Sequence, residues 1–281
     1  MTDPKTWFTP DALKPYWHDT TPPAQIALAY LAQDGKRFRP RLLATLYTTL
    51  GGTSQTIPRQ LAIAIECFHK ASLIHDDIED SDPTRDGYPA LHIRYGIPTA
   101  INTGDYLVAQ GYQLILQTPL DQPTLLQIVI HATRAYHSLA QGQGEELALS
   151  NAPQPPTQNT ILRLHERKTA AAFRAAVLIG ATAAGAPEPL CNALSTFATA
   201  AGIAYQIADD FNDSAAPPDA HRPQRPTLYS LPPPCPDADL LEAHLQAARA
   251  AIQPLESSLR QTLEAILDRM VPPSTLLRMR Q

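Results

Sequence analysis

Apolar residues recur at every third or fourth position over most of this chain, and the alternating pattern of strands is scarce. The 28 prolines mostly fall between the periodic stretches, where a proline ends a helix. The pattern predicts helices near residues 24–34, 40–50, 58–80, 98–117, 122–148, 158–185, 188–213 and 237–270. Residues 214–236 are rich in proline and lack a long apolar period, which predicts a surface loop. We therefore expect an all-α fold.

The size and composition of the chain indicate a folded globular protein. A length of 281 residues can bury a large apolar interior, and 44% hydrophobic with 17% charged residues is too apolar for a disordered chain. No internal repeat and no shift in composition divides the sequence. We expect one helical domain over residues 1–281.

Charge and cysteine content exclude several classes of protein. A net charge of -5 disfavours binding to nucleic acid or to an anionic membrane, so a bound anion needs a local cluster of cations. The 3 cysteines show no C-x-x-C spacing, which argues against disulfides and structural zinc and predicts a cytoplasmic protein. We also expect no signal peptide and no transmembrane segment, because no apolar stretch is long enough.

An acidic motif, D-D-x-x-D, occurs twice, at residues 76–80 and 209–213. The spacing puts Asp76 and Asp80 on one face of a helix, where their charges repel. One copy is equally well explained by a solvated helix end. Both copies, however, follow an apolar helical run and precede a loop, so the carboxylates lie at helix C-termini, where the helix dipole disfavours anions. Two such copies predict bound cations.

Mg²⁺ is the cation that best suits these carboxylates. It prefers oxygen ligands, keeps several waters and is normally shared with phosphate oxygens. The expected metal ligands are Asp76, Asp80, Asp209 and Asp213. The hypothesis is a diphosphate bridged by Mg²⁺ between two aspartate-bearing helices.

A diphosphate site also needs basic residues, and G-K-R-F-R-P at residues 35–40 places three of them just before a predicted helix. Taken alone, this stretch is better explained as a charged turn between helices. Lys168 lies in an alanine-rich helix, where it could simply reach solvent. His69 returns to the face of Asp76, about 10 Å along the helix. Glu66 and His69 form one E-x-x-H unit, but di-iron bundles need two, so an iron protein is a minor alternative.

Taken together, these residues resemble the trans-isoprenyl diphosphate synthase, or polyprenyl synthetase, family from about Gln25 to Arg269. The likeness rests on motifs that occur in the family's order. They are G-K-R-x-R-P at 35–40, E-x-x-H-x-x-S-L-I-H-D-D-x-x-D at 66–80, G-D at 104–105, G-Q at 142–143, K-T at 168–169 and Q-I-x-D-D-x-x-D at 206–213.

The resemblance implies an antiparallel helical bundle around a central cavity, usually a homodimer. It implies condensation of an allylic diphosphate with isopentenyl diphosphate, assisted by about three Mg²⁺ ions that promote ionisation of the allylic C–O bond. A pyrophosphate oxygen takes the final proton in the family, so no dedicated protein base is expected.

The same resemblance assigns roles to individual residues. Lys36, Arg39 and His69 are similar to the residues that bind isopentenyl diphosphate. Arg85, Lys168 and Gln206 are similar to residues on the allylic side, and Arg225 lies in a stretch similar to a later substrate-binding segment. Thr169 resembles the threonine beside the reacting carbon, so the expected catalytic group is Lys168, Thr169 and Gln206.

The sequence departs from the family pattern in two places. Asp86 stands where the family usually has a second arginine, which weakens the expected isopentenyl diphosphate site, and Asp34 replaces a glycine nearby. The loop after Asp213 is short and lacks an expected lysine. These changes keep open a terpene cyclase that ionises a preformed allylic diphosphate. A non-catalytic partner subunit is a third alternative, against which both complete motifs argue.

Product length follows from the residues before Asp76 if their helix lines a tunnel. Ser72 and Ala71 are small, and Phe68 is the first bulky side chain, about 12 Å below Asp76. This predicts products of about C15–C20, or longer, unless Phe68 packs into a neighbouring helix. Lys70 is unusual beside His69, and the sequence offers no physical account of it.

Overall fold

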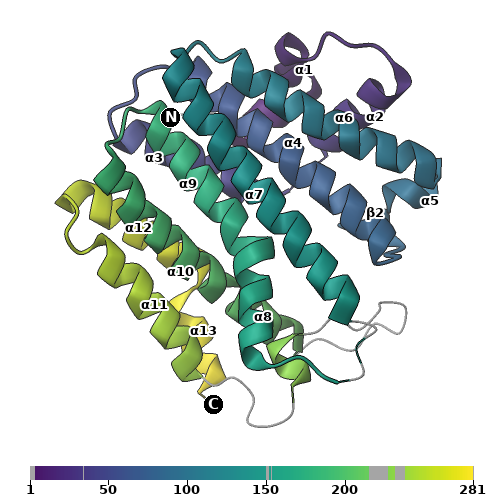
Figure 1. Cartoon of the computed structure of the whole chain (residues 1–281). Helices are drawn as coiled ribbons and strands as arrows, with labels where there is room; N and C mark the ends of the chain where they lie inside the picture. The colour runs from purple at the N-terminus through teal and green to yellow at the C-terminus, as the bar shows by residue number, and fades with distance from the viewer. Residues whose placement is uncertain are drawn as a thin grey trace. The chain divides into compact units, whose positions relative to one another are not determined.

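The structure is a computed structural model that describes residues 4–33, 35–149, 152, 154–214, 227–231 and 238–280. Its contacts divide the chain into two compact units, here called unit 1 and unit 2. Unit 1 contains the described residues up to Ala132 together with Ile179–Gly185, and unit 2 contains the other described residues. Figure 1 shows that helices build nearly all of the described chain.

Unit 1 is centred on a long buried helix, α4 (Thr56–Glu79), which packs against α2, α3 and α6. The unit also contains one short antiparallel hairpin in which Arg85 pairs with Tyr88. Its remaining elements are 3₁₀ turns at Pro4–Phe8 and Lys14–Tyr16, α1 (Pro10–Leu13), α2 (Pro22–Ala32), α3 (Phe38–Thr49), β1 (Thr84–Arg85), β2 (Tyr88–Pro89), α5 (Leu91–Tyr95), α6 (Ile97–Leu116) and the first part of α7 (Gln122–Leu149).

Glycines let α6 approach α4 closely. A Cβ atom at Gly104 would lie 2.2 Å from Nε2 of His75, and one at Gly111 would lie 2.8 Å from Cζ of Phe68. The two glycines are seven residues apart and therefore share one face of α6. Close helix packing thus explains the glycine of the G-D motif at 104–105.

Unit 2 is built around α10 (Glu188–Ser214), which packs against α11 (Ala238–Ile252) (Figure 1). Its other elements are the second part of α7, α8 (Gln158–His165), a π-helical segment (Glu166–Ala170), α9 (Ala171–Ala183) up to Leu178, a 3₁₀ turn at Leu228–Ser230, α12 (Ser257–Met270) and α13 (Pro273–Met279).

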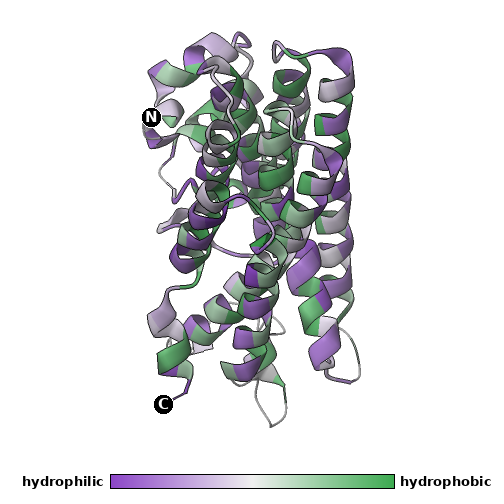
Figure 2. Ribbon diagram, turned by 90° about the vertical axis from the view of Figure 1, so that its left-hand side faces the viewer, coloured by the Kyte–Doolittle hydropathy of each residue, from purple (hydrophilic) through white to green (hydrophobic). Residues whose placement is uncertain are grey.

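The helix α12 of unit 2 buries one stripe of apolar residues. In α12 the buried residues Leu259, Leu263, Leu267 and Met270 recur at helical spacing, and most of its other residues are polar. This spacing is the one expected of a helix that lies on a core. Figure 2 shows hydrophilic and hydrophobic residues mixed along the helices. Among the described residues, no helix is sufficiently long and apolar to span a bilayer.

The predicted all-α fold is confirmed, and the expected helices occur close to their predicted bounds. Two predicted helices are interrupted: 158–185 by the π-helical segment and 237–270 by a break at 253–256, where Pro254 cannot continue the hydrogen-bond pattern. The hairpin, α5, α13 and the N-terminal turns were not expected. Most of the predicted loop 214–236 lies outside the described residues, and the single-domain assignment stays a prediction.

Candidate active site

The first aspartate motif lies at the C-terminal end of α4, as the sequence indicated. The helix ends at Glu79, and the backbone N–H of Asp80 donates to the carbonyl of Asp76 at 2.8 Å. Asp76 and Asp80 are both partly exposed and lie one turn apart. Both carboxylates are therefore partly exposed at this end of the helix, although Oδ2 of Asp80 is buried.

The middle residue of the motif, Asp77, faces the protein interior. Its side chain has 0% exposure and accepts hydrogen bonds from Nε of Arg85, at 2.7 Å, and from Nη2. The same Nη2 lies 3.2 Å from Oδ2 of Asp82. Burial raises the pKa of Asp77, and the Arg85 guanidinium opposes that shift. Arg85, expected on the allylic side, is thus held by two carboxylates of its own unit.

The hairpin turn explains why residue 86 is an aspartate, and the sequence analysis missed this explanation. Asp86 and Gly87 form the two-residue turn between β1 and β2, with φ of 52° and 81°. Hairpin turns of this kind need positive φ at both positions, and Asp-Gly is a preferred pair. The signal was present in the sequence as Asp-Gly between two short β-prone pairs. Asp86 itself is exposed at the hairpin tip.

The second motif repeats this division of roles at the end of α10. Asp209 is partly exposed and Asp213 is exposed, whereas Asp210 is only 5% exposed. Asp210 accepts from Nε2 of Gln206 at 3.1 Å and from the backbone N–H of Leu228 at 3.1 Å. It also lies 3.1 Å from Nε2 of His165. Asp210 therefore ties α8 and the turn at Leu228 to α10.

Each unit thus presents two outer carboxylates that could hold a metal. Among the described residues, no group of three or more His, Cys, Asp or Glu side chains is arranged to hold an ion by itself. Mg²⁺ is usually bound by one or two carboxylates, with waters and phosphate oxygens filling its other positions. The pairs Asp76 with Asp80 and Asp209 with Asp213 fit that chemistry.

The predicted catalytic residues of unit 2 lie together at the π-helical segment. The hydroxyl of Thr169 donates to Oε1 of Gln206 at 2.8 Å, and Gln206 in turn donates to Asp210. The ammonium of Lys168 forms an ion pair with Glu146 of α7, a partner that the sequence analysis did not identify. A π-helical turn inside an α-helix is frequent at functional sites.

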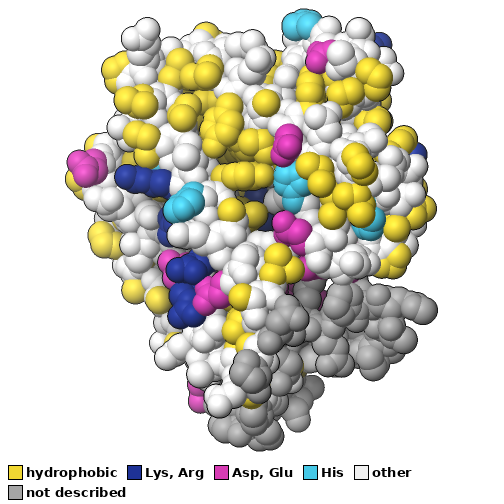
Figure 3. Space-filling view, turned by 45° about the vertical axis from the view of Figure 1, so that its right-hand side comes forward, with side chains coloured by type: hydrophobic (Ala, Val, Ile, Leu, Met, Phe, Trp, Pro, Cys, Tyr) yellow, Lys and Arg dark blue, Asp and Glu magenta, His cyan; other side chains and the backbone are white. Residues whose placement is uncertain are grey.

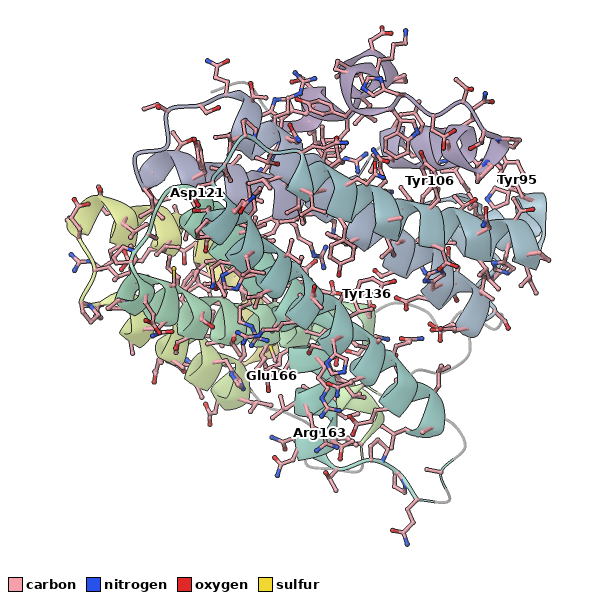
Figure 4. The ribbon with its side chains drawn as sticks, turned by 45° about the horizontal axis from the view of Figure 1, so that its top comes forward. Tyr95, Tyr106, Asp121, Tyr136, Arg163 and Glu166 are labelled. Atoms are coloured by element: carbon pink, nitrogen blue, oxygen red, sulfur yellow. The ribbon has the colours of Figure 1, made fainter. Side chains whose placement is uncertain are left out.

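A second set of ion pairs fastens the π-helical segment to α7. Glu145 accepts from Arg163 of α8 and, at 2.8 Å, from Nη1 of Arg167. Figure 4 labels Arg163 of α8 and Glu166, the first residue of the π-helical segment. At Gly142 a Cβ atom would lie 2.8 Å from Cγ of Lys168, so only glycine lets α7 come this close. This contact explains the glycine of the G-Q motif.

On the side of unit 1, the structure brings two predicted isopentenyl diphosphate residues together. Nη1 of Arg39 lies 3.2 Å from Nε2 of His69, although the residues are thirty positions apart. Burial and then the charge of Arg39 hold the pKa of His69 well below its usual value. The imidazole is therefore neutral and accepts from the guanidinium. Lys36 is exposed in the turn before α3.

Arg37, the middle cation of the G-K-R-x-R-P motif, has a structural role that was not predicted. It is 4% exposed, forms an ion pair with Glu66, and donates to the carbonyls of Leu31, at 2.8 Å, and Gln33. Its guanidinium also lies 4.3 Å from the ring centroid of Phe8. Glu66 is thereby committed to Arg37, which removes support from the iron-binding alternative.

The proposed chain-length residues are mostly packed inside unit 1. Ala71 is 0% exposed, and Ser72 is 4% exposed with its hydroxyl donating to the carbonyl of His69. The Phe68 ring makes an edge-on contact with Tyr112 of α6, with centroids 4.8 Å apart. This is the packing that the sequence analysis had left as an alternative. Arg225 lies outside the described residues.

A patch of exposed apolar side chains is present on unit 1, defined here as Tyr88, Ile93, Tyr95, Ile97 and Ile101. Each is at least 41% exposed. They come from β2, α5 and the first turns of α6, and Figure 4 labels Tyr95. Figure 3 shows many hydrophobic side chains on the face of the molecule that it displays. Clustered apolar exposure of this kind marks interaction surfaces.

The chain shares its all-α fold with solved prenyl diphosphate synthases. A geranylgeranyl pyrophosphate synthetase from Geoglobus acetivorans superposes with a TM-score of 0.84 at 21% identity, over 96% of this chain and 98% of that chain. The chain matches the polyprenyl synthetase family over residues 23–223. This chain is therefore a member of the polyprenyl synthetase family.

Two further proteins extend the comparison. A geranylgeranyl diphosphate synthase from Sulfolobus acidocaldarius is 36% identical over 203 residues, which make up 71% of this chain and 61% of that protein. A geranyltransferase from Helicobacter pylori, complexed with magnesium and isoprenyl diphosphate, gives a TM-score of 0.74 at 22% identity, over 96% of this chain and 98% of that chain. The chain spans about three fifths of the length of the curated relatives that it matches.

Proposed function

We propose that this protein is a Mg²⁺-dependent prenyltransferase. It condenses an allylic diphosphate with isopentenyl diphosphate to a longer trans-prenyl diphosphate of about C15–C20, the lengths that the names of its geranylgeranyl and farnesyl diphosphate synthase relatives indicate. The observation that carries this proposal is the shared design of the two aspartate motifs. In both, the outer aspartates are at least partly exposed while Asp77 and Asp210 are buried and hydrogen-bonded. The names of the family's members, among them geranylgeranyl and farnesyl diphosphate synthases, support the same reaction.

In this proposal, the outer carboxylates Asp76, Asp80, Asp209 and Asp213 hold about three Mg²⁺ ions together with the allylic diphosphate. Bound Mg²⁺ supplies charge stabilisation to the leaving diphosphate. Lys168 adds a protein cation on the same side. The Thr169 hydroxyl, held by Gln206, lies beside the allylic carbon and steadies the developing positive charge.

The second substrate binds at Lys36, Arg39 and His69. Arg39 supplies a fixed guanidinium, which suits the bidentate recognition of phosphate. Neutral His69 orients that guanidinium by accepting a hydrogen bond from it. The isopentenyl double bond then attacks the allylic cation, and pyrophosphate takes the proton that is lost.

The proposal requires that both units act as one catalytic domain. We further propose a cytoplasmic homodimer, for which the apolar patch of Tyr88, Ile93, Tyr95, Ile97 and Ile101 is a candidate contact surface. Measurement of the molar mass by light scattering, for the native chain and for Ile93→Asp, tests the dimer. A native monomer, or an unchanged dimer in Ile93→Asp, contradicts the respective part of this proposal.

One observation favours a second candidate, a terpene cyclase that needs a single diphosphate. The hairpin tip carries the exposed carboxylate of Asp86 where a cation would help bind isopentenyl diphosphate. Assays with geranyl, farnesyl and geranylgeranyl diphosphate, each with and without isopentenyl diphosphate, separate the two. Elongated diphosphates that form only with isopentenyl diphosphate support the prenyltransferase. Hydrocarbon or alcohol products without it support the cyclase, and no product in either arm refutes both.

A further inference from the structure

Lys70 is a buried cation in the middle of α4 that lacks an anionic partner. The residue is 3% exposed, and its Nζ lies 4.8 Å from the ring centroid of Tyr30 on α2. Among the described residues, no carboxylate lies within ion-pairing distance of its ammonium. Two other cations of unit 1 with little exposure are paired, Arg37 with Glu66 and Arg85 with Asp77.

The surroundings of Lys70 leave this charge only partly compensated. An ammonium out of water needs an anion or strong hydrogen-bond acceptors, and the face of one tyrosine replaces only part of its hydration. Burial accordingly lowers the pKa of Lys70, although Glu66 opposes the shift. The Tyr30 hydroxyl beside it is also buried without a partner. The site therefore has unused capacity to bind a negatively charged group.

Lys70 lies near the residues assigned to isopentenyl diphosphate, the substrate that keeps its diphosphate group during the reaction. Lys70 directly follows His69 in α4, and Nε2 of His69 lies 3.2 Å from Nη1 of Arg39. Asp77 lies two turns beyond Lys70 on the same face of α4 and holds Arg85, so the hairpin that carries Asp86 lies on this side of α4. Because Asp86 brings a negative charge to this region, a phosphate bound here needs an additional cation from elsewhere.

We propose that Lys70 is a diphosphate-binding residue, whose ammonium contacts the phosphate oxygens of isopentenyl diphosphate together with Arg39. This inference rests on the proposed function. It assigns a ligand to the one buried lysine of α4, and it explains how a site with Asp86 at its edge retains enough positive charge. A purely structural cation that only packs on Tyr30 is the alternative that the experiment excludes.

Lys70→Gln tests the proposal kinetically, with the exposed Lys14→Gln as the control. A charge-assisted contact to phosphate predicts that KM for isopentenyl diphosphate rises about tenfold or more in Lys70→Gln. KM for the allylic substrate should stay within about twofold of the native value, and Lys70→Arg should restore part of the loss. An unchanged KM for isopentenyl diphosphate, or equal rises for both substrates, overturns the proposal.

A binding experiment separates failure of this inference from failure of the proposed function. Calorimetric titration of inorganic pyrophosphate without Mg²⁺ is carried out on the native protein, Lys70→Gln and Lys70→Met. We expect about tenfold weaker binding in both variants. Equal affinity in native and variant proteins, or no binding by the native protein, refutes the role of Lys70 whether or not condensation is observed. Weaker binding in a protein that makes no elongated product supports the anion site and refutes only the prenyltransferase.

Thermal unfolding shows whether the variants remain folded. Lys70→Met keeps the unbranched apolar stem and removes the uncompensated charge, so its Tm should equal or exceed that of the native protein. A large fall in Tm for Lys70→Met indicates that the ammonium is required for packing on Tyr30, and this result also contradicts the proposal.

Discussion

The guanidinium of Arg85, from the hairpin, holds the buried carboxylate of Asp77 inside the first aspartate motif. The contact fixes the segment after α4 to the end of that helix. It also commits Asp77 to an internal role, so the proposed metal ligands of this motif are Asp76 and Asp80. Asp210 is used in the same way in the second motif, where it holds Leu228.

The first prediction contrasts Asp77→Asn with Asp76→Asn. Asp77→Asn leaves Arg85 half-buried beside a neutral group and should reduce the free energy of unfolding by about 3 kcal/mol, with little change in the Mg²⁺ concentration needed for activity. Asp76→Asn should raise that Mg²⁺ requirement at least about tenfold with unchanged stability. Urea unfolding and Mg²⁺ titration of activity measure both. A stability loss in Asp76→Asn together with a raised Mg²⁺ requirement in Asp77→Asn would contradict these two roles.

The second prediction concerns the buried pair of Arg37 and Glu66. Glu66→Gln should cost about 3 kcal/mol of unfolding free energy, because the Arg37 charge loses its partner away from water. Replacing both residues, as in Arg37→Met with Glu66→Leu, should recover part of the loss. Chemical denaturation of Arg37→Met, Glu66→Leu and the double variant gives the coupling energy. Additive effects of the two substitutions would refute a direct interaction.

The third prediction tests the close approach of α7 to the π-helical segment. Gly142→Ala places a Cβ atom 2.8 Å from Cγ of Lys168 and 2.9 Å from Cβ of Arg167, so the segment must shift. We expect kcat to fall about tenfold or more as Lys168 and Thr169 move. The matched control is Gly144→Ala in the same helix, where nothing lies within 4 Å and helix propensity favours alanine. Equal kcat in the two variants would contradict this role for Gly142.

Local features of the fold could be predicted from the sequence, whereas contacts between residues far apart in the chain could not. Helical periodicity and proline positions predicted the helices because both signals are local, and the aspartate motifs were correctly placed at helix ends. The π-helical segment was missed since one extra residue hardly changes an apolar period. The partners of Asp77 and Asp210 depend on side chains brought together by tertiary folding, which spacing alone does not specify.

Three other residues show where a local signal was present but misread or insufficient. Asp86 was interpreted through its charge alone, although Asp-Gly also predicts a hairpin turn. Arg37 looked like one of three similar cations, and only its burial against Glu66 separates it from Lys36. Lys70 was recognised as unusual, but its meaning depends on Tyr30, forty positions earlier in the chain.

The last prediction concerns the pH dependence of stability through His69, whose pKa is held well below its usual value by burial and by Arg39. The unfolded chain takes up a proton there at pH values below about 6.5, whereas the folded chain does not. Stability should therefore be full above that pH and should fall below it, by up to about 1.4 kcal/mol per pH unit from this residue. In His69→Gln this part of the acid sensitivity should disappear, whereas it should persist in the exposed-residue control His18→Gln. Urea unfolding at pH 7.5 and about 5.5 measures the difference, and equal acid sensitivity in the native protein and His69→Gln would show that His69 is protonated in the folded state.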